Sequence, residues 1–296
     1  MKTPASCPVF LLILGGLLSA PAAWADSVSG TFELGSKTLA PTSVAGFRVR
    51  DQENPRQFST YVMLSTSPMK IDAIANQADP YAAAINDPAV LSSDHIGMRV
   101  NADGTVVMNA HVGGTQYIDG SGILMAARGS LASECTTNTL ERVTCSVKNA
   151  KPVKTMGGKS WTIDVKFDTA VAARVSGKPL PADGGEAGKA LDALIKAAKG
   201  DDLDNIIALL APSEAENYQQ EYNTPEENLA SAKQMFDFSL PKHHKITGGE
   251  FRDEDTALLE VEGAPHAGMH VLYIVTMERT DGRWGFATSQ WAGILN

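Results

Sequence analysis

The chain has 296 residues, and its 34 acidic against 25 basic residues give a net charge of −9 at pH 7. The length exceeds the usual size of a single domain and favours two domains. The acidic excess argues against a nucleic-acid-binding protein, because contact with the phosphate backbone requires a basic surface.

The first 25 residues have the pattern of a secretory signal peptide. Lys2 precedes an apolar run over residues 9–18, and small residues then lead to Ala23-Trp24-Ala25. A basic start, a short apolar segment and an Ala-x-Ala site predict export and cleavage after Ala25. The alternative is a retained membrane anchor, but the run is too short to span a bilayer as a helix. We therefore expect a mature protein that is periplasmic or secreted and has no membrane span.

Residues 26–178 are expected to form an all-β domain. Trp161, Ile163, Val165 and Phe167 alternate with polar residues, which is the period of a strand with one buried face. Asp103-Gly104 predicts a hairpin within residues 98–112. Seven or eight short strands separated by turn residues favour a β-sandwich, with a small barrel as the alternative. Further strands are expected at residues 28–34, 46–50, 58–65, 123–133 and 142–147.

One segment of this domain breaks the strand pattern. Ile71, Ile74, Ala75 and Ala78 have helical spacing. Residues 69–85 are therefore expected to form a short helix or an irregular crossover between strands.

Cys135 and Cys145 are the only cysteines left after removal of the signal peptide. An even pair in an exported chain predicts one disulfide that clamps two strands, with Cα atoms about 4.4 to 6.8 Å apart. A loop this short would add about 2 to 3 kcal/mol of stability. The alternatives are two catalytic thiols, which the oxidising compartment disfavours, and a zinc site, which the absence of neighbouring His disfavours.

Residues 176–188 have the composition of a linker, with two prolines and four glycines. We expect the linker proper at residues 179–188, between domains of residues 26–178 and 189–296. The charge also changes here. Residues 26–185 hold 15 acidic and 15 basic residues, whereas residues 186–296 hold 19 acidic and 9 basic residues, a charge of 9 − 19 = −10.

A basic run precedes this boundary. It could meet an acidic partner or a membrane surface, although a solvated sheet face is the commoner cause of such a pattern. Docking of the basic strands on the acidic second domain would be electrostatically favoured. The run comprises Lys148, Lys151, Lys154, Lys159, Lys166, Arg174 and Lys178.

The second domain is expected to begin with three helices. The first carries an apolar stripe around Leu191 and Leu194, and Asp201 or Asp202 caps the second, which Pro212 ends. The third opens with the capping box Thr224-Pro225-Glu226-Glu227 and runs to Leu240.

Four antiparallel strands are expected to follow, within residues 245–291. The run over residues 269–279 is apolar on both faces, which is typical of a central strand. Asp281-Gly282 directly after it predicts a hairpin to the last strand. The four strand sequences are ITGGEF, TALLEVEG, MHVLYIVTMER and WGFATSQW.

This order of elements, the opening ALDALIKAAKGDDLDNIIALLAP and the closing DGRWGF and SQW resemble the nuclear-transport-factor-like superfamily over residues 186–296. The resemblance implies an α+β cone in which three helices cover a curled antiparallel sheet. Because the family includes enzymes, ligand carriers and catalytically silent domains, the resemblance implies where a pocket lies and leaves its chemistry open. Residues 26–178 resemble no family that we recognise.

The candidate ligand site lies inside this cone. Phe236, Tyr273 and Trp284 would give it an aromatic lining, and Asp237 or His270 would supply a polar anchor. Asp237 and His270 are also the candidates for acid–base catalysis, which Tyr218 or Tyr222 could assist by orienting a ligand. Alternatively, the aromatic residues simply fill the core.

No metal or cofactor is expected. On an unbroken strand His266 and His270 lie about 13 Å apart, too far to share a metal unless Ala267-Gly268 forms a bulge. His243 and His244 are expected to be exposed at the joint between a helix and a strand. The chain contains neither a nucleophile-elbow motif nor a phosphate loop nor a dinucleotide fingerprint.

The sequence therefore favours an exported, non-catalytic binding or interaction protein of the bacterial cell envelope. Its partner would be an envelope protein or a small apolar ligand, and a toxin-neutralising immunity protein would be a special case. The alternative is a small-molecule enzyme of the cone family that performs a dehydration, isomerisation or hydrolysis.

Overall fold

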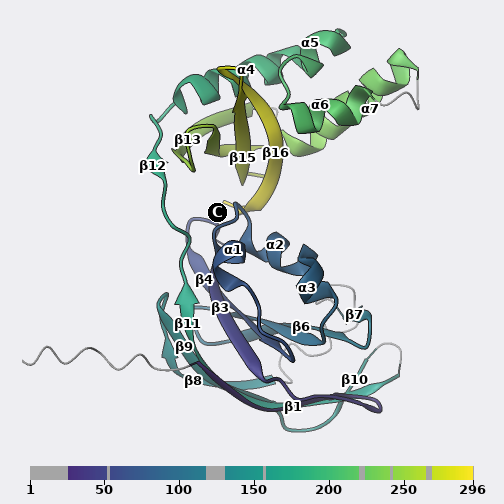
Figure 1. Cartoon of the computed structure of the whole chain (residues 1–296), viewed down its shortest axis with the longest axis vertical. Helices are drawn as coiled ribbons and strands as arrows, with labels where there is room; N and C mark the ends of the chain where they lie inside the picture. Colours follow the sequence, from purple (N-terminus) through teal and green to yellow (C-terminus); the bar gives the residue numbers. More distant parts are fainter. Residues whose placement is uncertain are drawn as a thin grey trace, which may run out of the picture.

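The structure is a computed structural model that describes residues 26–51, 54–117, 131–155, 158–219, 224–240, 243–264 and 269–295. The expected signal peptide, Tyr222 and His266 lie outside these ranges. The described residues form strands β1–β16 and helices α1–α7, arranged as an eleven-stranded sheet and a separate five-stranded sheet (Figure 1). No helix in these ranges is long and apolar enough to cross a membrane.

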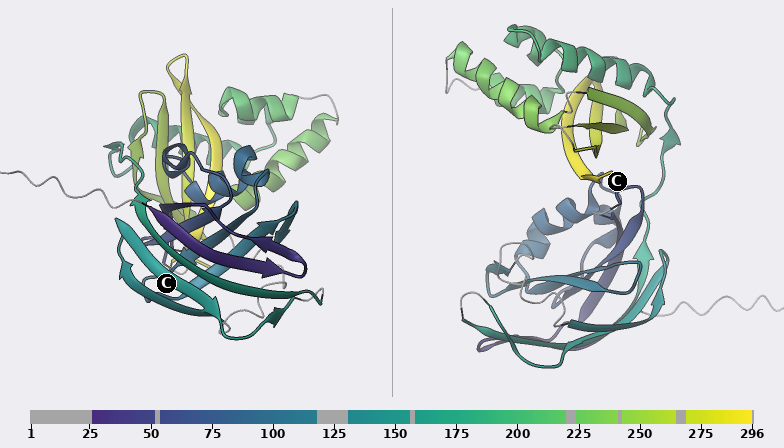
Figure 2. Two further views of the ribbon diagram at one scale, coloured as in Figure 1. Left: turned by 60° about the horizontal axis from the view of Figure 1, so that its bottom comes forward. Right: turned by 180° about the vertical axis from the view of Figure 1, so that it is seen from behind.

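The eleven-stranded sheet curls into a half-barrel (Figure 2). Its longest strand, β11 (Ser160–Ala172), pairs with β1 on one side and β9 on the other, and its last residues pair in parallel with β3. The sheet is therefore continuous, and β11 joins the layers that a sandwich would keep apart. The other strands are β1 (Ser27–Leu34), β2 (Lys37–Leu39), β3 (Ser43–Arg50), β4 (Phe58–Ser65), β5 (His95–Val100), β6 (Val106–Val112), β7 (Thr115–Tyr117), β8 (Leu131–Asn138), β9 (Arg142–Asn149) and β10 (Val153–Lys154).

The alternating pattern of β11 produces the core of the half-barrel. Trp161, Ile163, Val165 and Phe167 are all buried, as the sequence pattern predicts, and they pack against apolar residues of β4, β5 and β6. The Trp161 ring lies 6.0 Å from the ring of Phe32 on β1. Gly30 allows β1 to approach, because a Cβ at this position would lie 2.0 Å from the Asp164 carbonyl oxygen.

The segment expected to be a helix or a crossover forms two helices, α1 (Ile71–Ala75) and α2 (Pro80–Asn86), and a third turn, α3 (Pro88–Leu91), follows. Asp79 caps α2 and Asp87 caps α3. The helices cover the outer face of β3 and β4, where their apolar side chains pack against Phe47 and Met63. A single turn such as α3 has too few residues to show a helical period in the sequence.

Cys135 and Cys145 are bonded, as predicted, and they are direct cross-strand partners on β8 and β9. Their Cα atoms are 4.0 Å apart, slightly closer than the predicted range, because they face each other beside an irregularity in the register. The sequence analysis misplaced β8, which runs to Asn138 instead of ending at residue 133. Residues 123–130 of that expected strand lie outside the described residues.

The five-stranded sheet is the predicted antiparallel meander with one short strand added at its edge. Its order is β12 (Lys178–Pro179), β13 (His243–Phe251), β14 (Thr256–Ala264), β15 (Val271–Thr280) and β16 (Arg283–Ile294). Asp281 and Gly282, with φ values of 53° and 78°, form the predicted hairpin turn. β12 and the start of the next helix fall inside the stretch expected to be a linker.

Between β12 and β13 the described residues form four helices, one more than expected: α4 (Gly185–Ala197), α5 (Leu203–Ile207), α6 (Pro212–Gln219) and α7 (Pro225–Ser239). Pro212 begins α6, because proline suits the first turn of a helix, where its missing N–H has no partner to lose. The capping box at Thr224 and Glu227 is present. The helices pack on one face of the sheet through an apolar cluster that includes Leu191 and Phe286.

Replacing Tyr273 tests whether that cluster is a packed core. Tyr273 is 4% exposed and packs beneath these helices. Tyr273→Ala should lower the free energy of unfolding by about 3 to 5 kcal/mol, as measured by urea denaturation, because truncation leaves a cavity. Val175→Ala, at an exposed position, should change it by less than about 0.5 kcal/mol. A loss below about 1 kcal/mol for Tyr273→Ala would show an open pocket instead.

Mass spectrometry of the non-reduced protein tests the disulfide. Alkylation without reduction should leave Cys135 and Cys145 unlabelled and joined in one cross-linked peptide pair, because their sulfur atoms are bonded. Two labelled thiols would contradict the pairing.

Candidate functional site

Three of the predicted site residues are core residues of the second sheet. Phe236, Tyr273 and Trp284 are all buried. The Phe236 ring packs edge-on against Phe286 at 5.8 Å, and burial raises the pKa of the Tyr273 phenol. The structure therefore brings these aromatic residues together, between the helices and the sheet. Asp237 lies on α7, but its side chain is outside what the structure describes.

His270 does not join them. It lies three positions before Tyr273, and because strand side chains alternate, this odd spacing places the two on opposite faces. The His270 side chain is 57% exposed, and its Nε2 is 3.7 Å from a Glu262 carboxylate oxygen. It lines a shallow hollow with His243 and His244, which belong to β13 instead of the joint before it. The described residues contain no group of three or more side chains able to hold a metal.

Another histidine pair lies in the half-barrel. His95 and His111 are buried cross-strand partners with rings stacked 5.3 Å apart, and both Nδ1 atoms are 3.0 Å from the Ser93 carbonyl oxygen. Since a carbonyl only accepts hydrogen bonds, both Nδ1 atoms carry protons. Burial lowers the pKa of His95. This arrangement fixes the corner between α3 and β5.

The face of the second sheet opposite α4–α7 is also covered. Leu258, Leu272 and Ile274 point to this side and are buried, although they are outside the cluster beneath the helices. Figures 1 and 2 show α1 and α2 between the half-barrel and this face of the sheet. The sheet is therefore packed on both sides, as the apolar pattern of β15 indicates.

Ion pairs join the half-barrel to the second sheet. Arg50 Nη2 lies 2.5 Å from Glu260, Arg174 lies 2.9 Å from Glu250, and Arg56 contacts Glu262. Basic groups of the first part thus meet acidic groups of the second, as the charge pattern favours. Arg174 is the member of the basic run that takes part in these three ion pairs. Lys148 and Lys166 of the same run lie on β9 and β11 of the half-barrel.

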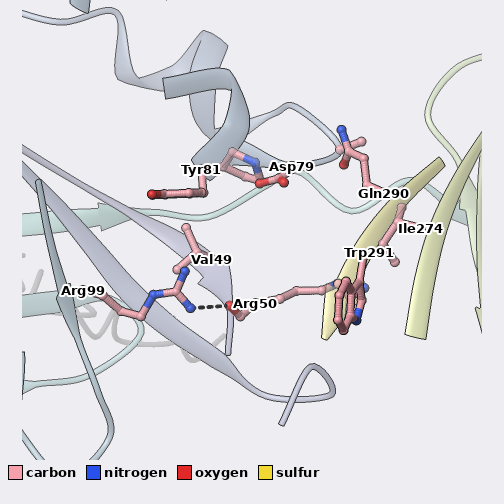
Figure 3. Close-up of a pocket in the computed structure, with 11 residues that line it drawn as sticks. Val49, Arg50, Asp79, Tyr81, Arg99, Ile274, Gln290 and Trp291 are labelled. Carbon is pink, nitrogen blue, oxygen red and sulfur yellow. Dashed lines mark hydrogen bonds between the residues drawn. The ribbon is translucent and has the colours of Figure 1, made fainter. Parts of the chain in front are cut away.

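A crevice remains open beside these contacts (Figure 3). It has a volume of about 80 Å³ and continues into a groove of about 660 Å³ between α1–α2 and the second sheet. Ala78, Asp79 and Gln290 line both, so the crevice and the groove adjoin at these residues. We call this site the inter-sheet crevice.

One wall of the inter-sheet crevice is built on β3, β5 and α2. The guanidinium of Arg99 lies 5.8 Å over the Tyr81 ring and donates a hydrogen bond of 3.1 Å to the Arg50 carbonyl, the dashed line in Figure 3. Tyr81 packs edge-on against the buried Tyr61 at 5.1 Å. Asp79 accepts a hydrogen bond from the Ala82 amide at the start of α2. Packing and capping therefore hold this wall in place.

The opposite wall is built on β15 and β16. Trp291 is 57% exposed, although it is a large apolar side chain. The neighbouring Gln290 has a buried Oε1 without a hydrogen-bond partner among the described residues. Buried acceptors are normally paired, so an unpaired one indicates that a donor belongs there. From the sequence, Trp291 was expected only as the end of the last strand, and the adjacent Gln290 and Trp291 were the available signal for this role.

Glu250 tests the joint between the two parts of the chain. Its side chain is only 14% exposed, and it pairs with Arg174 and Arg252 and accepts a hydrogen bond from the Gly177 amide. Glu250→Gln should lower the free energy of unfolding by about 1 to 3 kcal/mol, because it leaves partly buried guanidiniums unpaired. Asp255→Asn, which breaks the more exposed pair with Arg279, should cost less than about 1 kcal/mol. Equal effects would argue against a structural joint at Glu250.

Compared with known proteins, the chain matches no protein-family model and no curated protein.

Proposed function

We propose that the protein is an exported, non-catalytic binding protein of the bacterial cell envelope, and that it holds its ligand in the inter-sheet crevice. The observation that carries this proposal is the exposed Trp291 beside the unpaired Gln290 acceptor on one wall of the crevice. Ligand sites commonly lie between structural units and combine apolar surface with a few polar groups that fix orientation.

Two features support export. The first 25 residues have the composition of a signal peptide, and the Cys135–Cys145 disulfide is of a kind that persists in oxidising compartments. Both features support a location outside the cytoplasm, periplasmic or secreted.

We also infer that the two sheets mark two domains, residues 26–178 and 189–296, and that the second is a nuclear-transport-factor-like cone. Separate apolar clusters in the two parts support the division. Helices packed on one face of a curled antiparallel sheet support the cone.

The inter-sheet crevice is a better candidate than the interior of the cone. The three aromatic residues expected to line the cone are buried in one apolar cluster: Phe236, Tyr273 and Trp284. They therefore fill the space that a ligand would need. In contrast, the aromatic surface of Trp291 is accessible. An envelope partner would reach the crevice without unfolding either sheet.

A thermal-shift screen of a fragment library tests this proposal. Fragments that bind in the crevice should raise the melting temperature of the mature protein and should lose most of that effect on Trp291→Ala, because the variant removes the exposed ring. Leu140→Ala, which also truncates a partly exposed apolar side chain but in the turn between β8 and β9, should leave the shifts unchanged. Shifts that persist in full on Trp291→Ala would reject the crevice as the binding site.

A further inference from the structure

We infer that the inter-sheet crevice binds a neutral saccharide. This assignment rests on the proposed function and specifies the class of ligand. It follows from the mixed charges of the lining, from its uncharged polar groups and from the exposed aromatic ring.

The charged groups of the lining are of both signs. The crevice and groove are lined by the guanidiniums of Arg50, Arg99 and Arg252 and by the carboxylates of Asp79, Asp253 and Glu278. Arg50 and Arg252 are also paired with Glu260 and Glu250, so the lining has no cluster of unpaired basic groups that would select an anion. A neutral ligand that both donates and accepts hydrogen bonds fits such a lining better than an anion does.

The second sheet contributes three hydroxyl groups to the groove. Thr276 on β15 and Thr288 on β16 are direct cross-strand partners, and Thr256 lies on the adjacent β14, opposite Glu278. The hydroxyls of these three residues have no hydrogen-bond partner within the described part of the chain. A hydroxyl donates one hydrogen bond and accepts others, which is the complement that a sugar hydroxyl requires.

The helical wall contributes amide oxygens. Gln77 and Asn86 each donate a side-chain N–H to a backbone carbonyl of their own helix, at 3.2 and 2.9 Å, which leaves the amide oxygens as acceptors. Gln290 lines the groove from the facing sheet, but its Oε1 is buried, so the acceptors open to a ligand are those of Gln77 and Asn86. A ligand with several hydroxyl donors satisfies them together.

Trp291 supplies the apolar part of the site. A pyranose ring carries polarised C–H groups on one face, and these are attracted to the negative face of an aromatic ring. Tyr81 lines the same crevice from the other wall. The groove, at about 660 Å³, is within the range of small-molecule sites, about 300 to 1,000 Å³, and is large enough for a short oligosaccharide.

The inference is tested with the mature protein on an array of neutral oligosaccharides, followed by titration calorimetry of the best ligand. We expect binding that weakens by about tenfold or more in Trp291→Ala, as is typical for an aromatic residue at the centre of an interface. Trp291→Tyr should restore most of it, since the ring face returns. Thr276→Val should weaken binding by about fivefold through the loss of one hydroxyl.

Leu140→Ala is the matched control and should bind as the parent does. Spermidine and triglycine, titrated in parallel, represent a cation and a peptide. If either binds in a Trp291-dependent way while the oligosaccharides do not, the saccharide assignment is wrong and the binding function of the crevice stands. Both proposals are wrong if nothing binds in a way that depends on Trp291, whether oligosaccharide, control ligand or library fragment.

Discussion

The burial of both faces of β15 is the constraint on which the rest of the structure depends. Val271, Val275 and Met277 face the helices, while Leu272 and Ile274 face the half-barrel. Five buried apolar side chains of this size represent on the order of 10 kcal/mol of transfer free energy. The chain satisfies this requirement by placing α4–α7 on one side and α1–α2 on the other.

The two contacts differ in character. The helical side is apolar and continuous, as expected for a core, whereas the side toward the half-barrel is edged by Arg50, Arg174 and Arg252 with their carboxylate partners. Partly exposed ion pairs add little stability, but they fix the position of one surface on another. The inter-sheet crevice lies at the border between the apolar contact and these ion pairs. Arg50 and Arg252 belong to the ion pairs and also line the site, and its polar lining follows from this position.

The sequence was informative wherever the signal was local. The alternation of β11, the hairpin at Asp281-Gly282 and the capping box at Thr224 each depend on neighbouring residues, and all three were predicted correctly. The disulfide was predicted from compartment and cysteine count. In contrast, the predicted bounds of β8 were wrong, and so was the prediction that Pro212 ends a helix, because a polar strand and a proline-initiated helix resemble loops in sequence.

The candidate site was not predictable in the same way. His270 and Tyr273 were assigned to one pocket, although the parity of their spacing already separates them. The crevice depends on the docking of α2 on β15 and β16, segments about 200 residues apart in the chain, and no local pattern records that contact.

The central claim is that ligand binds between the two sheets and not between the second sheet and α4–α7. The most direct test of this claim is fluorine NMR of the mature protein labelled with 5-fluorotryptophan. The mature protein contains three tryptophans, Trp161, Trp284 and Trp291. On titration with the best oligosaccharide, the account predicts that the Trp291 resonance shifts while those of the buried Trp161 and Trp284 stay in place. A shift of Trp284 with Trp291 unchanged would place the ligand between the second sheet and α4–α7 and contradict the account.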